Sequence, residues 1–168
     1  FPPIPGLIVS STAELQAAIG GMSPTILLQA GTYTSITISR NLTIASLGDG
    51  VVVLRRVSVL SGGNVKLIGL HLTGSSAGEG GGVYLEDADL EMTRCLVYNN
   101  RATYGGGVRV KSGQLKMEDC EIYENAAENI NGAGGAMYID GGTIVMIRCK
   151  VRKNRTQGHR IYSGGISI

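Results

Sequence analysis

The chain of 168 residues carries a formal net charge of +2 and contains 26 glycines, one phenylalanine and no tryptophan. This length suits one domain, and the composition predicts a core of small and aliphatic side chains. The weak charge excludes nucleic acid as an expected partner, and because no apolar run is long enough to cross a bilayer, we expect no transmembrane segment.

The first predicted element is a short helix over residues 11–20, "STAELQAAIG". Ser11 or Thr12 can cap its N-terminus. Its apolar stripe is formed by Leu15, Ala18 and Ile19. We expect this helix to cover the N-terminal end of a stack of strands, whose exposed edges and apolar cross-section would otherwise aggregate.

Short strands are predicted after the helix. Residues 25–56 contain the apolar runs "TILLQAGTYTSITIS", "NLTIAS" and "VVVLRR", separated by polar or glycine residues. Runs of this length, bounded in this way, are typical of β-strands. Because their spacing is not constant, we expect irregular first turns here.

Residues 57–168 contain an internal repeat. Cys95, Cys120 and Cys149 recur at the same intervals as Asn100, Asn125 and Asn154. The apolar residues that follow glycine pairs share these intervals; they are Val83, Val108, Met137 and Ile166. The second interval is longer than the first because of an insertion in the loop around "AAENINGAGG". A period of about 25 to 29 residues indicates a solenoid or an array.

Each repeat contains three short runs in which inward and outward residues alternate. In one copy the inward residues are Val83 and Leu85, then Leu90 and Met92, then Cys95 and Val97. The segment 57–75 joins the series through Leu67, Leu70, Leu72 and Ser75. Three strands per repeat, stacked in register, predict an all-β fold that is a single parallel β-helix with a capping helix.

The opening "STAELQAAI", "TILLQAGTY" and "ITISRNLTI" resembles the start of pectate-lyase-like right-handed β-helix proteins. The pairs "GGGV" with "VYNN", "GGGV" with "IYEN" and "GGAM" with "VRKN" resemble the repeats of chlamydial-type polymorphic outer-membrane proteins, with Val97, Ile122 and Val151 in place of the aromatic residue. The resemblance covers about residues 11–45 for the opening and 57–168 for the repeats, and it implies a right-handed β-helix. We expect residues 1–168 to form one such domain. This architecture hosts lyases, hydrolases, adhesins and inert scaffolds, so the fold alone does not assign a function.

The repeated cysteines and asparagines are interpreted as structural columns. A straight file of three thiols cannot supply the four tetrahedral ligands of a structural zinc site, so we expect three free, buried cysteines. Asparagines in stacked turns can hydrogen-bond their own backbone and one another. We therefore predict no metal and no cofactor.

The acidic residues of the middle repeat offer the best case for an enzyme. Glu118, Asp119, Glu121 and Glu124 lie close together in the sequence, with Arg94 and Arg148 at equivalent positions of the flanking repeats. Opposite charges on neighbouring strands also stabilise each other, and this plainer interpretation predicts no catalytic residue. The pairs that it predicts are Asp119 with Arg94 and Arg148, Glu121 with Lys150, Glu124 with Lys153, and Lys111 with Glu86 and Asp140.

Outward-facing aromatic and basic residues form the candidate interaction surface. It comprises the column Tyr84, Arg109 and Tyr138, the column Tyr98, Tyr123 and Arg152, and the basic residues Lys153, Arg155 and Arg160 of the last repeat. The columns can serve internal cation–π pairing or contact with a partner, and the basic residues can dock an acidic partner.

Two functions remain open at this stage. The first is a non-catalytic binding module, adhesin-like or an accessory subunit, whose protein partner could cover the C-terminal end, where "IYSGGISI" resembles the start of a further turn. The second is a carbohydrate-active enzyme, which would make polysaccharide the partner. Only 126–134 and 155–163 are long enough to build walls around a cleft, which favours the first. The compartment stays open, with a preference for an extracellular site or the lumen of an organelle or the periplasm.

Overall fold

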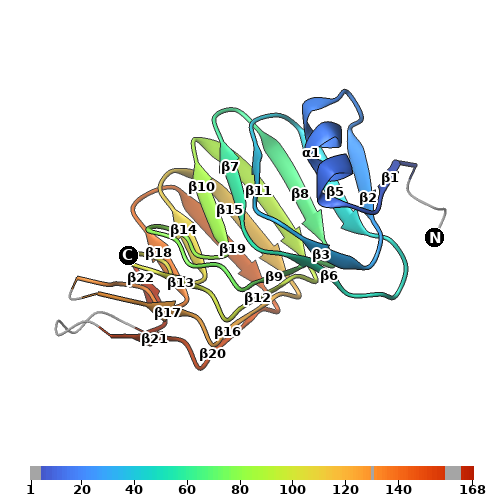
Figure 1. Ribbon diagram of the computed structural model, residues 1–168. Coiled ribbons are helices and arrows are strands. Elements are labelled where there is room, and N and C mark those ends of the chain that lie inside the picture. The colour runs from blue at the N-terminus through green and yellow to red at the C-terminus, as the bar shows by residue number, and fades with distance from the viewer. Residues whose placement is uncertain (1–4, 130, 158–163) are drawn as a thin grey trace.

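The computed structural model describes residues 5–129, 131–157 and 164–168, which form a parallel β-solenoid (Figure 1). Sheet A contains β1 (Leu7–Val9), β2 (Thr25–Leu28), β5 (Leu42–Ser46), β8 (Asn64–Ile68), β11 (Ala88–Thr93), β15 (Gly113–Glu118) and β19 (Thr143–Ile147). Sheet B contains β3 (Gly31–Tyr33), β6 (Val52–Leu54), β9 (His71–Thr73), β12 (Leu96–Tyr98), β16 (Glu121–Tyr123) and β20 (Lys150–Arg152).

The solenoid has two more sheets, of which sheet D is confined to the last three coils. Sheet C contains β4 (Ile36–Ile38), β7 (Val57–Leu60), β10 (Val83–Glu86), β14 (Val108–Val110), β18 (Met137–Ile139) and β22 (Ile166–Ser167). Sheet D is short and contains β13 (Arg101–Ala102), β17 (Ala126–Ala127) and β21 (Arg155–Thr156). The predicted three strands per coil are confirmed, and in the last three coils sheet D adds a fourth that the repeat pattern did not indicate.

The register confirms the repeat. Strand pairing aligns Leu67 with Met92, Met92 with Met117 and Met117 with Met146, so equivalent residues of successive repeats are neighbours. Ala102 pairs with Ala127 at the shorter interval, whereas Tyr104 bridges Ala133 at the longer one. The insertion therefore lies between β17 and β18, in the loop that the sequence indicated.

The first coils are shorter than the later ones. Ile26 pairs with Ile44, and Ile44 pairs with Leu67, so these partners are closer in the sequence than Leu67 and Met92 are. Each early coil still contributes a strand to sheets A, B and C, so the expected irregularity lies in the turns rather than in the strands.

Helix α1 (Thr12–Gly20) lies at the N-terminal end of the stack in Figure 1. The Ser11 side chain caps it by accepting a hydrogen bond from the Glu14 N–H at 3.2 Å. Leu15 and Ala18 are buried, and Ile19 packs against the core, which confirms the predicted apolar stripe. No helix in the described part of the chain is long and apolar enough to span a membrane.

The cysteines form a file of free thiols. Cys95 and Cys120 are buried and Cys149 is half-buried. The Cys95 thiol donates to the Leu67 carbonyl at 3.4 Å, and the Cys120 thiol likewise donates to Met92. A hydrogen bond with Cys120, together with burial, raises the pKa of Cys95 well above its ordinary value. These thiols pack as small apolar groups, as expected.

The asparagines form a buried ladder between sheets B and D. Asn125 Oδ1 accepts from the Asn100 backbone N–H at 3.0 Å and from its side-chain Nδ2 at 3.1 Å. Asn125 Nδ2 donates to Val97 O and to Asn154 Oδ1, so each amide bonds to the coils on both sides. The ladder also reaches Ser75, whose N–H donates to Asn100 Oδ1.

The residues just before the ladder adopt left-handed backbone conformations. Asn99, Glu124 and Lys153 have φ of 52°, 55° and 53°. This turn directs the asparagine that follows into the core. The side chains that flank the asparagines are exposed, except for the buried Ala126, and they belong to the candidate site described next.

Candidate functional site

Arg109 is the centre of the first predicted column. It pairs in register with Tyr84 and Tyr138, as expected. Its guanidinium lies 5.5 Å from the centre of the Tyr138 ring and 5.2 Å from that of Tyr104, which the sequence analysis did not single out. Only 11% of the Arg109 side chain is exposed. Arg109 is therefore mostly enclosed by its own neighbours.

Two carboxylates complete the enclosure of Arg109. Asp140 Oδ2 accepts from its Nη2 at 2.6 Å, and Glu79 Oε1 lies 2.5 Å from Nη1 in an ionic contact without hydrogen-bond alignment. The prediction that Asp140 pairs with Lys111 is wrong, because Asp140 binds Arg109, while Lys111 binds Glu86. Glu79 and Tyr104 occupy equivalent positions of successive repeats and bridge each other, so the repeat period could have identified them.

The second column is also internally paired. Tyr98 and Tyr123 stack with ring centres 5.0 Å apart at an angle of 5°. The Arg152 guanidinium lies 4.4 Å above Tyr123, and the His71 ring meets the edge of Tyr98. Arg152 also binds Glu121, so the predicted pair between Glu121 and Lys150 is wrong. The longer arginine reaches back to the preceding coil to bind that carboxylate. The facing sides of these rings are covered.

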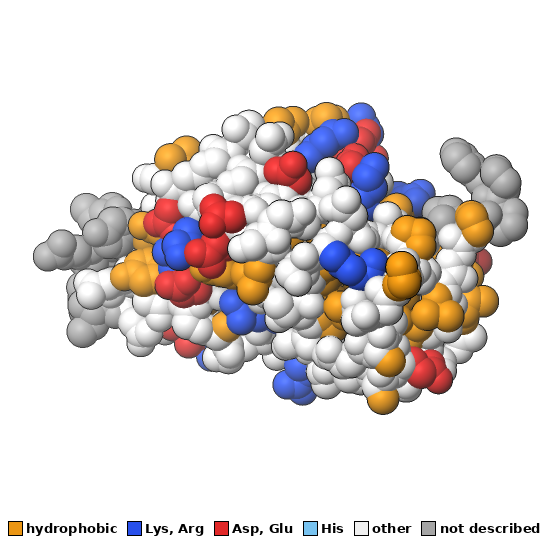
Figure 2. Space-filling view, turned by 90° about the horizontal axis from the view of Figure 1, so that it is seen from above, with side chains coloured by type: hydrophobic (Ala, Val, Ile, Leu, Met, Phe, Trp, Pro, Cys, Tyr) orange, Lys and Arg blue, Asp and Glu red, His pale blue; other side chains and the backbone are white. Residues whose placement is uncertain are grey.

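The acidic residues near Arg148 act as its ligands. Arg148 Nε donates to Asp119 Oδ1 at 2.7 Å and its Nη2 to Glu118 Oε1 at 2.5 Å. Arg148 lowers the pKa of Asp119, mainly through this hydrogen bond, and Arg94 adds a smaller effect. Such pairing of opposite charges is visible in Figure 2, where Lys and Arg side chains adjoin Asp and Glu side chains.

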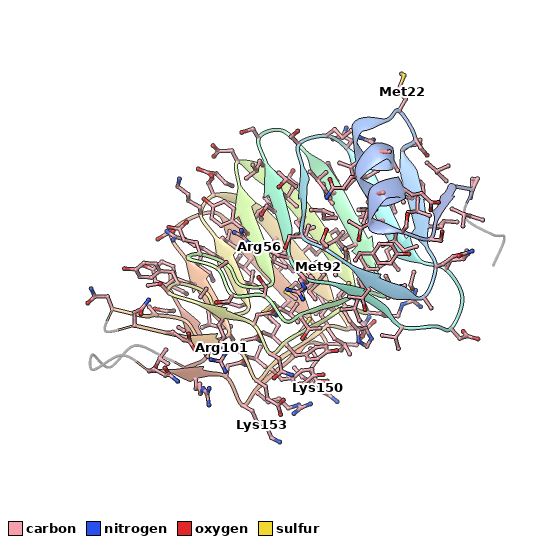
Figure 3. All side chains as sticks on the ribbon, in the orientation of Figure 1. Met22, Arg56, Met92, Arg101, Lys150 and Lys153 are labelled. Carbon is pink, nitrogen blue, oxygen red and sulfur yellow. The ribbon has the colours of Figure 1, made fainter. Side chains whose placement is uncertain are left out.

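The last coil carries cations that these pairings do not use. Lys150, Lys153 and Arg155 are exposed and form no ion pair within the described ranges. The predicted pair between Glu124 and Lys153 is accordingly not formed among those residues. Lys150 and Lys153 lie along the lower edge of the molecule in Figure 3. Arg160 lies outside the described residues.

A hollow of about 440 Å³ lies beside Lys153 and Arg155; we call it the basic groove. Its lining comprises Asn99, Arg101, Glu124, Ala126, Lys153 and Arg155. Asn99, Glu124 and Lys153 stack at successive left-handed turns. Arg101, Ala126 and Arg155 stack in sheet D. The two rows flank the buried asparagine ladder. Arg101 and Ala126 were not expected here, because a residue's part in a groove depends on its neighbours in the next coils.

The groove combines three basic side chains with one carboxylate and one amide. Arg101 already holds a carboxylate, since its Nη1 lies 3.0 Å from Glu128 Oε1. Guanidinium groups bind carboxylates through directional, charge-assisted hydrogen bonds. This arrangement is suited to binding an anionic group.

Comparison with known proteins agrees with the fold. Residues 22–168 match the family model described as the right-handed β-helix region. The comparison with curated proteins and the comparison with solved structures each give no match. Because the matched residues cover most of the chain and the strands form the corresponding solenoid, the chain belongs to the right-handed β-helix family.

Proposed function

We propose that this β-helix is a non-catalytic binding module that recognises an acidic protein partner through the basic groove and the adjoining Lys150. The observation that carries the proposal is the set of exposed cations on the last coil, Lys150, Lys153 and Arg155, which have no carboxylate partner in the described part of the chain. Unneutralised cations on one edge attract a partner of opposite charge and speed its association.

Three other conspicuous basic side chains are already engaged in ion pairs within the chain, which distinguishes them from the exposed cations proposed to bind a partner. Arg109, Arg148 and Arg152 are each held by carboxylates of the same chain. Of the four acidic residues that an enzyme would need, Glu118, Asp119 and Glu121 are engaged in those pairs. The repeat resemblance to surface proteins suggests the setting, either an adhesin-like surface domain or an accessory subunit of a larger complex.

Binding to an acidic polypeptide tests the proposal. The probe is poly-L-glutamate, with affinity measured by calorimetry at low and at high salt. We expect Lys150→Glu combined with Lys153→Glu to weaken binding by about tenfold or more, because two attractions become repulsions. Raising the salt should weaken the wild-type complex by screening it.

The control is charge reversal at the opposite end of the stack. Arg55 is exposed and belongs to the early coils, so Arg55→Glu changes the net charge without touching the groove. Equal losses from the Arg55 variant would indicate a general charge effect and would count against the proposed surface.

A further inference from the structure

We infer that the basic groove binds an extended acidic peptide segment, whose carboxylates contact Arg101 and Arg155 on either side of Ala126. The inference rests on the proposed function and specifies its ligand and its binding site.

The row in sheet D sets the spacing of the two guanidinium groups. Arg101 pairs in register with Ala126, and Ala126 with Arg155. Neighbouring strands are about 4.8 Å apart, so the two arginine backbones are separated by about 10 Å. Ala126 lies between them with only 3% of its surface exposed, and it forms part of the lining of the hollow of about 440 Å³.

The opposite wall is held by the turn before the asparagine ladder. Asn99, Glu124 and Lys153 share a left-handed backbone conformation, and the asparagines that follow them are bonded to the adjacent coils. The wall is therefore rigid before any ligand binds, and a rigid site loses less entropy on binding. It offers one ammonium group, one amide and one carboxylate.

Glu128 shows how a ligand carboxylate would bind. It comes from the same coil as Ala126 and contacts Arg101 at 3.0 Å, while 57% of the Arg101 side chain remains exposed. Arg155 forms no such contact within the described ranges and is open to a carboxylate from outside. An incoming acidic segment would occupy Arg155 and compete with Glu128 at Arg101.

The lining favours a peptide over a glycan or a single small anion. No aromatic side chain is among the described residues that line the groove, and the nearby rings of Tyr98 and Tyr123 stack on each other. Sugar rings commonly stack on open aromatic faces, which this lining does not offer. A single phosphate ion would occupy only part of the hollow of about 440 Å³, whereas an extended acidic chain can present several carboxylates along it.

Position 126 permits a test in which the protein supplies its own competing ligand. The variant Ala126→Glu places a carboxylate in register between Arg101 and Arg155, where opposite charges on adjacent strands attract. We expect it to weaken binding of a fluorescein-labelled Glu-rich dodecapeptide by about tenfold or more, measured by anisotropy. Ala126→Gln introduces a side chain of nearly the same shape as glutamate but without its charge. Its affinity for the peptide should stay within about twofold of that of wild type. Urea unfolding verifies that both variants are folded.

The variant Glu128→Gln tests the same site through an expected gain in peptide affinity instead of a loss. Removing the internal carboxylate from Arg101 should tighten peptide binding by about threefold or more, a result that partial unfolding could not produce. Equal binding by wild type, Ala126→Glu and Glu128→Gln would overturn the inference.

The outcomes separate this inference from the proposed function. If Lys150→Glu with Lys153→Glu weakens polyglutamate binding while Ala126→Glu does not weaken peptide binding, the acidic partner stands and the groove assignment fails. If neither change weakens binding, both fail. Tighter binding of a sulfated oligosaccharide or of inorganic phosphate, abolished by Ala126→Glu, would overturn the peptide assignment.

Discussion

At the residue scale, the glycine triplets are explained by close approach between coils. A Cβ built on Gly106 would lie 2.5 Å from the carbonyl carbon of Ala126, and one on Gly107 would lie 2.7 Å from the carbonyl oxygen of Ala136. Gly105 has φ of 65°, a conformation that glycine adopts without strain. The motif is therefore a packing requirement.

The substitution Gly106→Ala tests this close approach. The added methyl group must push two backbone segments apart, so we expect the free energy of unfolding to fall by about 1–3 kcal/mol. Urea denaturation measures the change. Gly78→Ala is the matched control, because nothing lies within 4 Å of a Cβ at that position. Equal stability of the two variants would show that the coils can separate without cost.

At the element scale, the asparagine ladder joins the coils more directly than the surface ion pairs do. Asn100 and Asn125 are fully buried, and each amide hydrogen-bonds to neighbouring coils through both its oxygen and its nitrogen. In the surface ion pairs of Arg148 and Lys111, about half or more of the basic side chain is exposed, and exposed pairs contribute little to stability.

The substitution Asn125→Ala should therefore be costly. It removes the acceptor of the buried Asn100 N–H, and we expect a loss of about 2–4 kcal/mol in unfolding free energy by urea denaturation. Asn64→Ala provides the comparison, since that side chain is exposed at the start of β8 and should change stability by less than about 0.5 kcal/mol. A small effect at Asn125 would mean that water replaces the amide.

At the scale of the whole molecule, charges on successive coils favour one register over its alternatives. Glu91 lies between Lys66 and Lys116, and Asp119 binds Arg148 of the next coil. A coil that slipped by one residue would lose these partners and would also turn its inward residues outward. Among the described residues, Lys150, Lys153 and Arg155 of the last coil form no such ion pair.

These charges predict how stability depends on pH. Hydrogen bonds from Lys111, Lys66 and Arg148 are the largest causes that lower the pKa values of Glu86, Glu91 and Asp119, whose ordinary values are 4.5, 4.5 and 3.8. A carboxylate with a lowered folded pKa stabilises the fold above its ordinary pKa, and this contribution is lost as the pH falls through the folded value. Urea midpoints should therefore drop between about pH 5.5 and about pH 3.

Burial of His71 adds a further loss of stability, which sets in at higher pH than the loss caused by the carboxylates. Burial lowers its pKa below the ordinary 6.5, so the unfolded chain takes up a proton before the folded chain does, and stability falls as the pH drops below 6.5. The variant His71→Gln should remove the decline between about pH 7 and about pH 5.5 and leave the decline at lower pH. Midpoints that stay constant over the whole range would contradict both assignments.

The sequence by itself determined the periodic part of this protein. The repeat interval specifies the coil, the insertion in one loop, the thiol file and the asparagine ladder, because in-register stacking places equivalent residues side by side. The capping helix was equally predictable from its cap residue and apolar stripe.

Only the tertiary structure decided which side chains bind each other across coils. Arginine is long enough to reach several carboxylates, so Asp140 and Glu121 bind Arg109 and Arg152 instead of Lys111 and Lys150, the partners that simple alignment predicted for these carboxylates. The basic groove likewise depends on a small residue between two large ones and on the turn that faces them. Such features depend on side-chain reach and three-dimensional shape, which a one-dimensional period does not encode.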